Sequence, residues 1–131
     1  MKYMLIMNAP RDGYAQFMRW PKELLQANMA FMRAFSQKLR ESGELVLTEA
    51  LGAPTEAKLV RGDEAGRMIT DGVFPESKEY LAGWWIVDVQ SEARALAIAA
   101  EASHAPGMPI TRADGTTIDH LWIEVRAVMG K

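Results

Sequence analysis

Four charged side chains fall between residues 71 and 79, within the stretch TDGVFPESKEYLAGWWIVDV at residues 70–89. Asp71 could act as a general base or anchor a substrate at the mouth of a pocket, and Glu79 could act as a second catalytic carboxylate. An Asp-Gly turn, in which the Asp71 carboxylate accepts hydrogen bonds from nearby backbone N–H groups, explains the same residue without any chemistry. Both interpretations stay open at the level of sequence.

Three residues between these two acids could contact a ligand, namely Phe74, Glu76 and Lys78. Opposite charges this close together could form a lid in which each group alters the acidity of the next. A solvated loop with weak surface ion pairs is the simpler explanation of the charges.

The remaining candidate residues lie in or beside two expected helices. Asn28 interrupts an apolar helical stripe and could bind a ligand, bond a buried backbone group or pair across a subunit interface. Arg33 borders the stripe and could anchor an anionic substrate, although a surface arginine needs no such role. His104 is a third catalytic candidate, but the negative end of a helix dipole also explains its place at a helix C-terminus. A metal site would require His104, His120 and a carboxylate such as Asp114 to meet, and nothing in their spacing demands it.

Composition excludes several other classes of function. The 131 residues suit a single domain over 1–131 with a substantial core. A net charge of −2 gives no basic field for nucleic acid or an anionic membrane surface. The absence of cysteine removes disulfides and thiolate chemistry, and the chain shows no signal peptide and no apolar run of membrane length. With no phosphate-binding glycine loop and no GxSxG motif, we expect a cytoplasmic protein without cofactor or metal.

Hydrophobic periodicity predicts the elements that must position the candidate residues. KYMLIM at residues 2–7 predicts a buried strand, and residues 21–42 predict a long amphipathic helix closed by Gly43. Residues 44–51 predict a strand, and residues 57–61 and 67–70 predict a hairpin around Gly62, Asp63 and Gly66. Gly83 to Val89 carries large apolar side chains on both faces, which indicates a central strand.

The C-terminal third of the chain predicts one further helix and one further strand. Ser91 is a suitable N-cap for an alanine-rich helix over residues 92–103 that could lie close to a sheet. A turn-rich segment at 108–117 follows, and residues 120–128 alternate as the last strand. Apart from the extra hairpin, the order is βαββαβ, the ferredoxin-like α+β arrangement. Helices on one sheet face would leave an aromatic face bare, and we expect a homodimer to cover it.

The stretch at 70–89 resembles the signature of the DGPF domain family, also called the YCII-related family. The matching residues are Asp71, Gly72, Phe74, Glu76, Lys78, Glu79 and Gly83, while Val73 stands where the family pattern has proline. The N-terminal KYMLIM, the long helix and the closing IEVRAV also fit, and the segment at 108–119 is longer than the pattern suggests. The resemblance implies a dimeric ferredoxin-like α/β barrel.

The family resemblance limits what can be carried over about function. A broader relative is a dehydrochlorinase of chlorinated hydroquinones, and members are often encoded near sigma-factor-like regulators. A His-Asp pair proposed for the YCII branch does not transfer, because Trp20-Pro21-Lys22 occupies the region of its histidine. We therefore expect a small-molecule pocket between sheet and helices, near Asp71 and Glu76 to Glu79, with acid–base chemistry as one possibility. The alternative is a non-catalytic dimeric module that engages a protein partner in transcriptional regulation.

Overall fold

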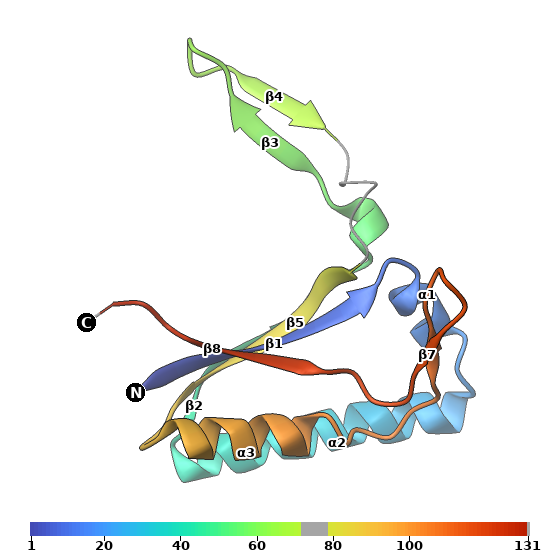
Figure 1. Ribbon diagram of the computed structural model, residues 1–131, viewed down its shortest axis with the longest axis vertical. Coiled ribbons are helices and arrows are strands. Elements are labelled where there is room, and N and C mark those ends of the chain that lie inside the picture. The colour runs from blue at the N-terminus through green and yellow to red at the C-terminus, as the bar shows by residue number, and fades with distance from the viewer. Residues whose placement is uncertain (72–78, 131) are drawn as a thin grey trace.

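The computed structural model describes residues 1–71 and 79–130. It has the mixed α+β class that the sequence predicts, with antiparallel sheets (Figure 1). In chain order the helices and strands are β1 (Lys2–Pro10), α1 (Gly13–Met18), α2 (Lys22–Ser42), β2 (Leu45–Ala50), the 3-10 turn η1 (Pro54–Glu56), β3 (Leu59–Gly62), β4 (Met68–Asp71), β5 (Glu79–Asp88), α3 (Glu92–Ala102), β6 (Ile110–Thr111), β7 (Thr117–Ile118) and β8 (Ile123–Ala127).

The main sheet has four strands in the order β2-β5-β1-β8, and every neighbouring pair is antiparallel. Its register pairs Leu5 of β1 with Trp85 of β5 on one side and with Val125 of β8 on the other. The strand with apolar residues on both faces, β5, is an inner strand between β1 and β2, as the sequence predicts. Helices α2 and α3 lie side by side against one face of this sheet (Figure 1).

The core lies between the two long helices and the sheet face that they cover. Side chains of β5 alternate, so Trp85 and Val87 are buried against the helices while Trp84 and Ile86 point to the other face and are only half-buried. Phe35 of α2 meets the Trp85 ring edge-on, with ring centroids 5.5 Å apart. Helix α3 contributes mainly small buried residues, which let it lie close to the sheet: Ala95, Ala99 and Ala102, beside Ile98.

The ends of both long helices match the sequence signals. Gly43 caps α2 in the left-handed conformation, with φ of 80°, and the Ser91 side chain accepts a hydrogen bond from the Arg94 N–H at the start of α3. Pro21 sits one residue before α2 instead of inside its first turn.

One ion pair fastens the start of α3 to the residue that precedes β2. Both guanidinium nitrogens Nε and Nη2 of Arg94 donate to the Glu44 carboxylate at 2.8 Å. This hydrogen bonding, partly opposed by desolvation, lowers the pKa of Glu44 to about 2. Lys38 and Glu101 form a second bridge, between α2 and α3.

Three local features differ from the sequence-based expectations. Strand β1 continues to Pro10 through an irregularity between Met7 and Asn8, where a break was expected. A short helix, α1, follows; six residues are too few for hydrophobic periodicity to reveal a helix. The last strand begins at Ile123 instead of His120, and Leu121, which precedes it, lines a cavity.

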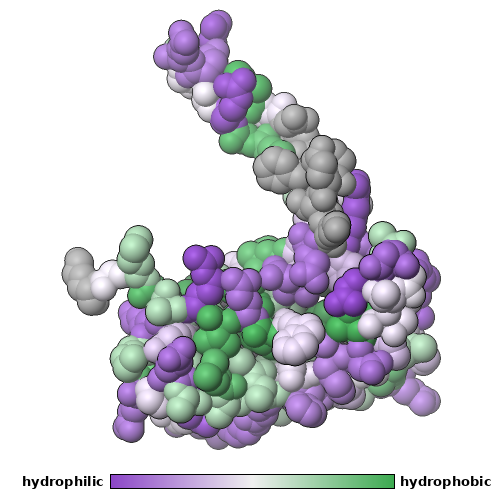
Figure 2. Space-filling view, in the orientation of Figure 1, coloured by the Kyte–Doolittle hydropathy of each residue, from purple (hydrophilic) through white to green (hydrophobic). Residues whose placement is uncertain are grey.

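The expected hairpin is present as a separate two-stranded sheet of β3 and β4, and it projects away from the main sheet (Figure 1). The Asp63 carboxylate closes its turn by accepting hydrogen bonds from the backbone N–H groups of Ala65 and Arg67, and Gly66 has a positive φ of 80°. Figure 2 shows a hydrophilic tip with apolar residues along the strands behind it. A second small hairpin, β6–β7, occupies the turn-rich segment.

Candidate functional site

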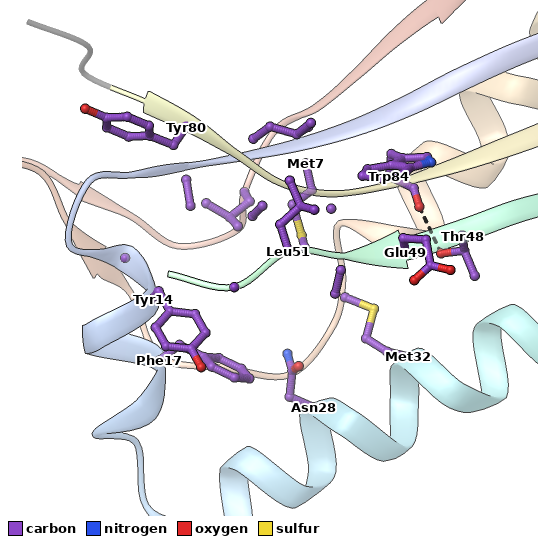
Figure 3. A pocket seen from close by; sticks show the side chains of 18 of the residues that line it. Met7, Tyr14, Phe17, Asn28, Met32, Thr48, Glu49, Leu51, Tyr80 and Trp84 are labelled. Carbon is purple, nitrogen blue, oxygen red and sulfur yellow. Dashed lines mark hydrogen bonds between the residues drawn. The ribbon is translucent and has the colours of Figure 1, made fainter. Parts of the chain in front are cut away.

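A hollow of about 540 Å³ lies between one end of the main sheet and the helices α1 and α2. Figure 3 shows side chains from α1, α2 and the strands β1 and β2 around it. Strand β1 runs beyond its pairing with β8 toward α1, and residues at the end of β1 and on α1 both line the hollow.

Aromatic and methionine side chains are prominent in the cavity wall. Tyr14 and Phe17 come from α1, and Trp20 follows in the link to α2, with its ring edge-on to Phe17 at 5.0 Å between centroids. Gly107 lies against the Trp20 ring, which leaves no room for a Cβ at that position. Further apolar side chains of the wall are Met7, Met29, Met32, Leu51, Leu81, Ile110 and Leu121.

Several polar groups of the wall already have partners. The Asn28 side-chain amide donates to the Pro106 carbonyl at 2.9 Å, which ties α2 to the segment after α3. The Thr48 hydroxyl donates to the Trp84 carbonyl at 2.9 Å (Figure 3), and the Trp85 indole N–H donates to the Ser36 hydroxyl at 3.4 Å. The wall is therefore largely apolar, with polar atoms fixed at a few positions.

Two charged residues also line the cavity, Arg33 from α2 and Glu49 from β2. Both are exposed, which places them toward solvent at the rim. Within the described part of the chain, neither forms an ion pair with another residue. Their charges remain available to a bound molecule.

The structure brings two of the sequence-predicted ligand residues together, because Asn28 and Arg33 both line this cavity. The Asn28 amide bonds a backbone carbonyl, which is one of the three roles expected for it, and the same residue lines the cavity. Both residues lie on α2, the helix whose hydrophobic periodicity predicted a single apolar face.

The predicted catalytic residues lie elsewhere. Glu79 begins β5 and lines a separate hollow of about 300 Å³, together with Asn8, Trp122 and Glu124. Asp71 ends β4, opposite Leu59 in the hairpin. His104 follows the end of α3, beside His120. Phe74, Glu76 and Lys78 lie outside the described residues.

Sequence reasoning missed most of the cavity wall. Tyr14, Phe17 and Trp20 recur at intervals of three, but α1 ends at Met18, before Trp20, so this spacing is too short a signal to predict a helix. Thr48 and Glu49 carried no such signal, because a strand in isolation does not reveal what lies across from it.

In the described ranges 1–71 and 79–130, no group of three or more histidine, aspartate or glutamate side chains could hold a metal ion. None of the described helices is long and apolar enough to cross a membrane.

The fold and cavity define an α+β protein with helices on one face of an antiparallel sheet and a largely apolar pocket at the sheet's end. Within that class, the chain belongs to the YCII-related domain family, whose model matches residues 1–108. It is also similar to an uncharacterized protein of Rhizobium meliloti (strain 1021), with 33% identity over 86 residues that cover 66% of this chain and 69% of the relative. The family expected from the signature at 70–89 is thus confirmed.

Proposed function

We propose that this YCII-related protein binds an apolar small molecule in the cavity between the sheet end, α1 and α2. The observation that carries the proposal is a hollow of about 540 Å³ walled by aromatic and methionine side chains, with few polar groups. Small-molecule sites have this size and this mixture of apolar wall and sparse polar contacts. Methionines suit such a wall because their flexible side chains adapt to a ligand's shape.

The polar contacts favour a ligand with an apolar body and one polar or anionic end. Arg33 offers a guanidinium at the rim, and a guanidinium binds carboxylates through two parallel hydrogen bonds. Asn28 presents an amide group on the same helix, two turns before Ser36. The aromatic side chains of α1 would contact the apolar body of the ligand.

Acid–base chemistry without a cofactor is a further step of the same proposal. Glu49 is the carboxylate among the cavity residues, so it is the group that could accept a proton from a bound molecule. The catalytic roles predicted for Asp71, Glu79 and His104 stay predictions. Glu79 would act from the smaller hollow that it shares with Glu124 and Trp122.

A second candidate function rests on the β3–β4 hairpin. Its Val60 and Met68 side chains are 60% and 74% exposed, although both are apolar. An exposed apolar hairpin is typical of a surface that contacts another protein. This observation favours the alternative in which the chain is an interaction module without catalysis.

Filling the cavity tests the binding proposal. Met32→Trp replaces a linear side chain with a bulky indole ring that fills part of the cavity. We therefore expect binding of an apolar fluorescent probe, anilinonaphthalene sulfonate, to weaken at least tenfold. Met18→Trp is the matched control, because Met18 is 52% exposed and does not line the cavity. Equilibrium dialysis gives the affinities, and circular dichroism confirms that both variants fold.

The two outcomes separate the two candidate functions. Equal probe affinity in Met32→Trp and the native chain would contradict a binding cavity and leave the hairpin-based interaction module as the better proposal. Loss of binding only in Met32→Trp supports the cavity.

We also propose that the chain is one half of a dimeric, ferredoxin-like α/β barrel. The strand order β2-β5-β1-β8 and the two helical crossovers on one face support the ferredoxin-like topology. On the opposite face, β1 and β5 place Ile6 beside Trp84 and Met4 beside Ile86, all half-buried in the single chain. A second copy packed face to face would bury these side chains.

A further inference from the structure

The two histidines of the chain lie side by side although sixteen positions separate them in sequence. The ring centroids of His104 and His120 are 5.3 Å apart and the ring planes are tilted by 30°. Both residues are exposed to solvent, and they lie outside the proposed ligand cavity. The sequence has no other histidine and no cysteine, so these two rings are its only imidazole side chains and it has no thiol ligand.

A backbone hydrogen bond orients the first ring. The Nδ1 of His104 lies 2.9 Å from the Ala100 carbonyl oxygen, which is an acceptor, so Nδ1 carries the proton and donates it. Because α3 ends at Ala102, that carbonyl is one of the helix-end acceptors without a helical partner. In the neutral ring, Nε2 then keeps its lone pair. Metal-binding histidines are commonly held in this way, with one nitrogen bonded to a backbone carbonyl and the other free for the metal.

The spacing of the rings fits a shared ion. Metal–nitrogen bonds of 2.0–2.1 Å to two imidazoles at ordinary coordination angles place the ring centroids about 4.5 to 6 Å apart. The separation of 5.3 Å lies in this range. Imidazole nitrogens favour Zn²⁺, Ni²⁺ and Cu²⁺ over magnesium or calcium.

We propose that His104 and His120 form a two-histidine site for a first-row transition-metal ion, with water at its remaining positions. This site goes beyond the proposed function and does not depend on it. Because no group of three or more histidine and acidic side chains occurs among residues 1–71 and 79–130, the ion stays open to solvent and exchangeable.

The surrounding fold holds the second histidine near the first. His120 follows β7, whose Ile118 is buried and pairs with buried Ile110 of β6. Gln16 of α1 fastens that hairpin by two hydrogen bonds to the Thr111 backbone, of 2.8 and 2.9 Å. A bound ion would therefore link the end of α3 to the segment that leads into β8.

Metal titration of the untagged full-length chain tests the site. In a non-coordinating buffer at pH 7.5, calorimetry with Ni²⁺ should show one ion per chain. His104→Gln and His120→Gln should each weaken binding at least tenfold, because one ring cannot chelate the ion. Glu92→Gln, at the other end of α3, is the control for ions held by surface carboxylates and should bind Ni²⁺ as the native chain does.

Two outcomes would overturn the proposal. The first is no Ni²⁺ binding by the native chain, which would leave the histidines as a ring contact alone. The second is unchanged affinity in both single variants with half the stoichiometry, which would mean two independent imidazoles.

A second measurement does not depend on calorimetry. Zn²⁺ should shift the ring proton signals of both histidines in parallel and raise the unfolding temperature of the native chain, since a ligand of the folded state stabilises it. Neither single variant should show that stabilisation. Probe binding in the cavity by the same variants shows that they remain folded and keeps failure of this site distinct from failure of the proposed function.

Discussion

Glu44 shows how a single side chain can fasten two elements. Its carboxylate accepts two hydrogen bonds from Arg94, and a third comes from the Ser42 hydroxyl at 2.8 Å. The Arg94 side chain is 44% exposed, so solvent screens much of the interaction, and we estimate about 1 kcal/mol for the pair. The lowered pKa of Glu44 makes this contribution depend on pH.

The pH dependence has a definite direction. Because the pKa of Glu44 falls from 4.5 to about 2 on folding, the stabilisation is complete above pH 4.5 and is lost as pH falls toward 2. Glu44→Gln should therefore lower the free energy of unfolding by about 1 kcal/mol at pH 7 and by much less near pH 2. Urea unfolding at both pH values measures this. A penalty that stays constant with pH, or an equal one in the hairpin variant Glu64→Gln, would contradict it.

The sequence marked Asn28 as unusual, but it did not predict which group Asn28 would bond. Asn28 is a polar residue inside the apolar stripe of α2, and it lies in the cavity wall. The carbonyl that it bonds belongs to Pro106, which is 78 positions away. No local pattern contains that information, because the partner is set by how α2 and α3 pack.

At the scale of elements, the alanine-rich α3 depends on close packing. Ala95 is fully buried in the core cluster. Ala95→Leu would force three extra carbons into filled space and should cost about 1–3 kcal/mol of stability. Ala97→Leu is the matched control, because Ala97 is exposed on the same helix and should change stability little. Thermal unfolding compares the stability of the two variants. Equal melting temperatures would show that the contact between α3 and the sheet has space for a larger side chain.

The long helices and the inner strand were predictable because each repeats one pattern over many residues. Residues 21–42 predicted α2, and residues 83–89 predicted the inner strand β5, although β5 begins earlier, at Glu79, in what was expected to be a loop. Helix α1 was missed because a helix of six residues is too short for a hydrophobic period to be recognised. The extension of β1 to Pro10 was missed for another reason, since Pro10 is a residue that usually ends a strand.

At the scale of the whole molecule, the sheet face opposite the helices is the surface through which we expect two copies of the chain to form a dimer. Trp84 and Ile86 of β5 lie on it, with Leu47 of β2 45% exposed in the single chain. We expect a dimer by sedimentation at micromolar concentration, and Ile86→Lys should produce a monomer because a charge cannot be buried there unpaired. Leu96→Lys, on exposed α3, is the control and should remain dimeric. A monomeric native chain would refute the sheet-face dimer.

The family and class were the most predictable properties of the whole chain. The resemblance at residues 70–89 led to the YCII-related family, and the family model confirms it over residues 1–108. A pocket was expected between sheet and helices near Asp71 and Glu76 to Glu79, whereas Glu79 lines a separate, smaller hollow. The wall of the larger cavity draws on residues from Met7 to Leu121, and such a set becomes visible only when the chain is folded.

Two of those wall residues, Ile110 and Leu121, come from beyond the region that the family model matches. Strands β1, β2 and β5 and helix α2 lie inside the matched region, whereas β8, Ile110 and Leu121 follow it. Substitutions at Ile110 and Leu121 would therefore change the cavity wall while leaving every matched residue in place.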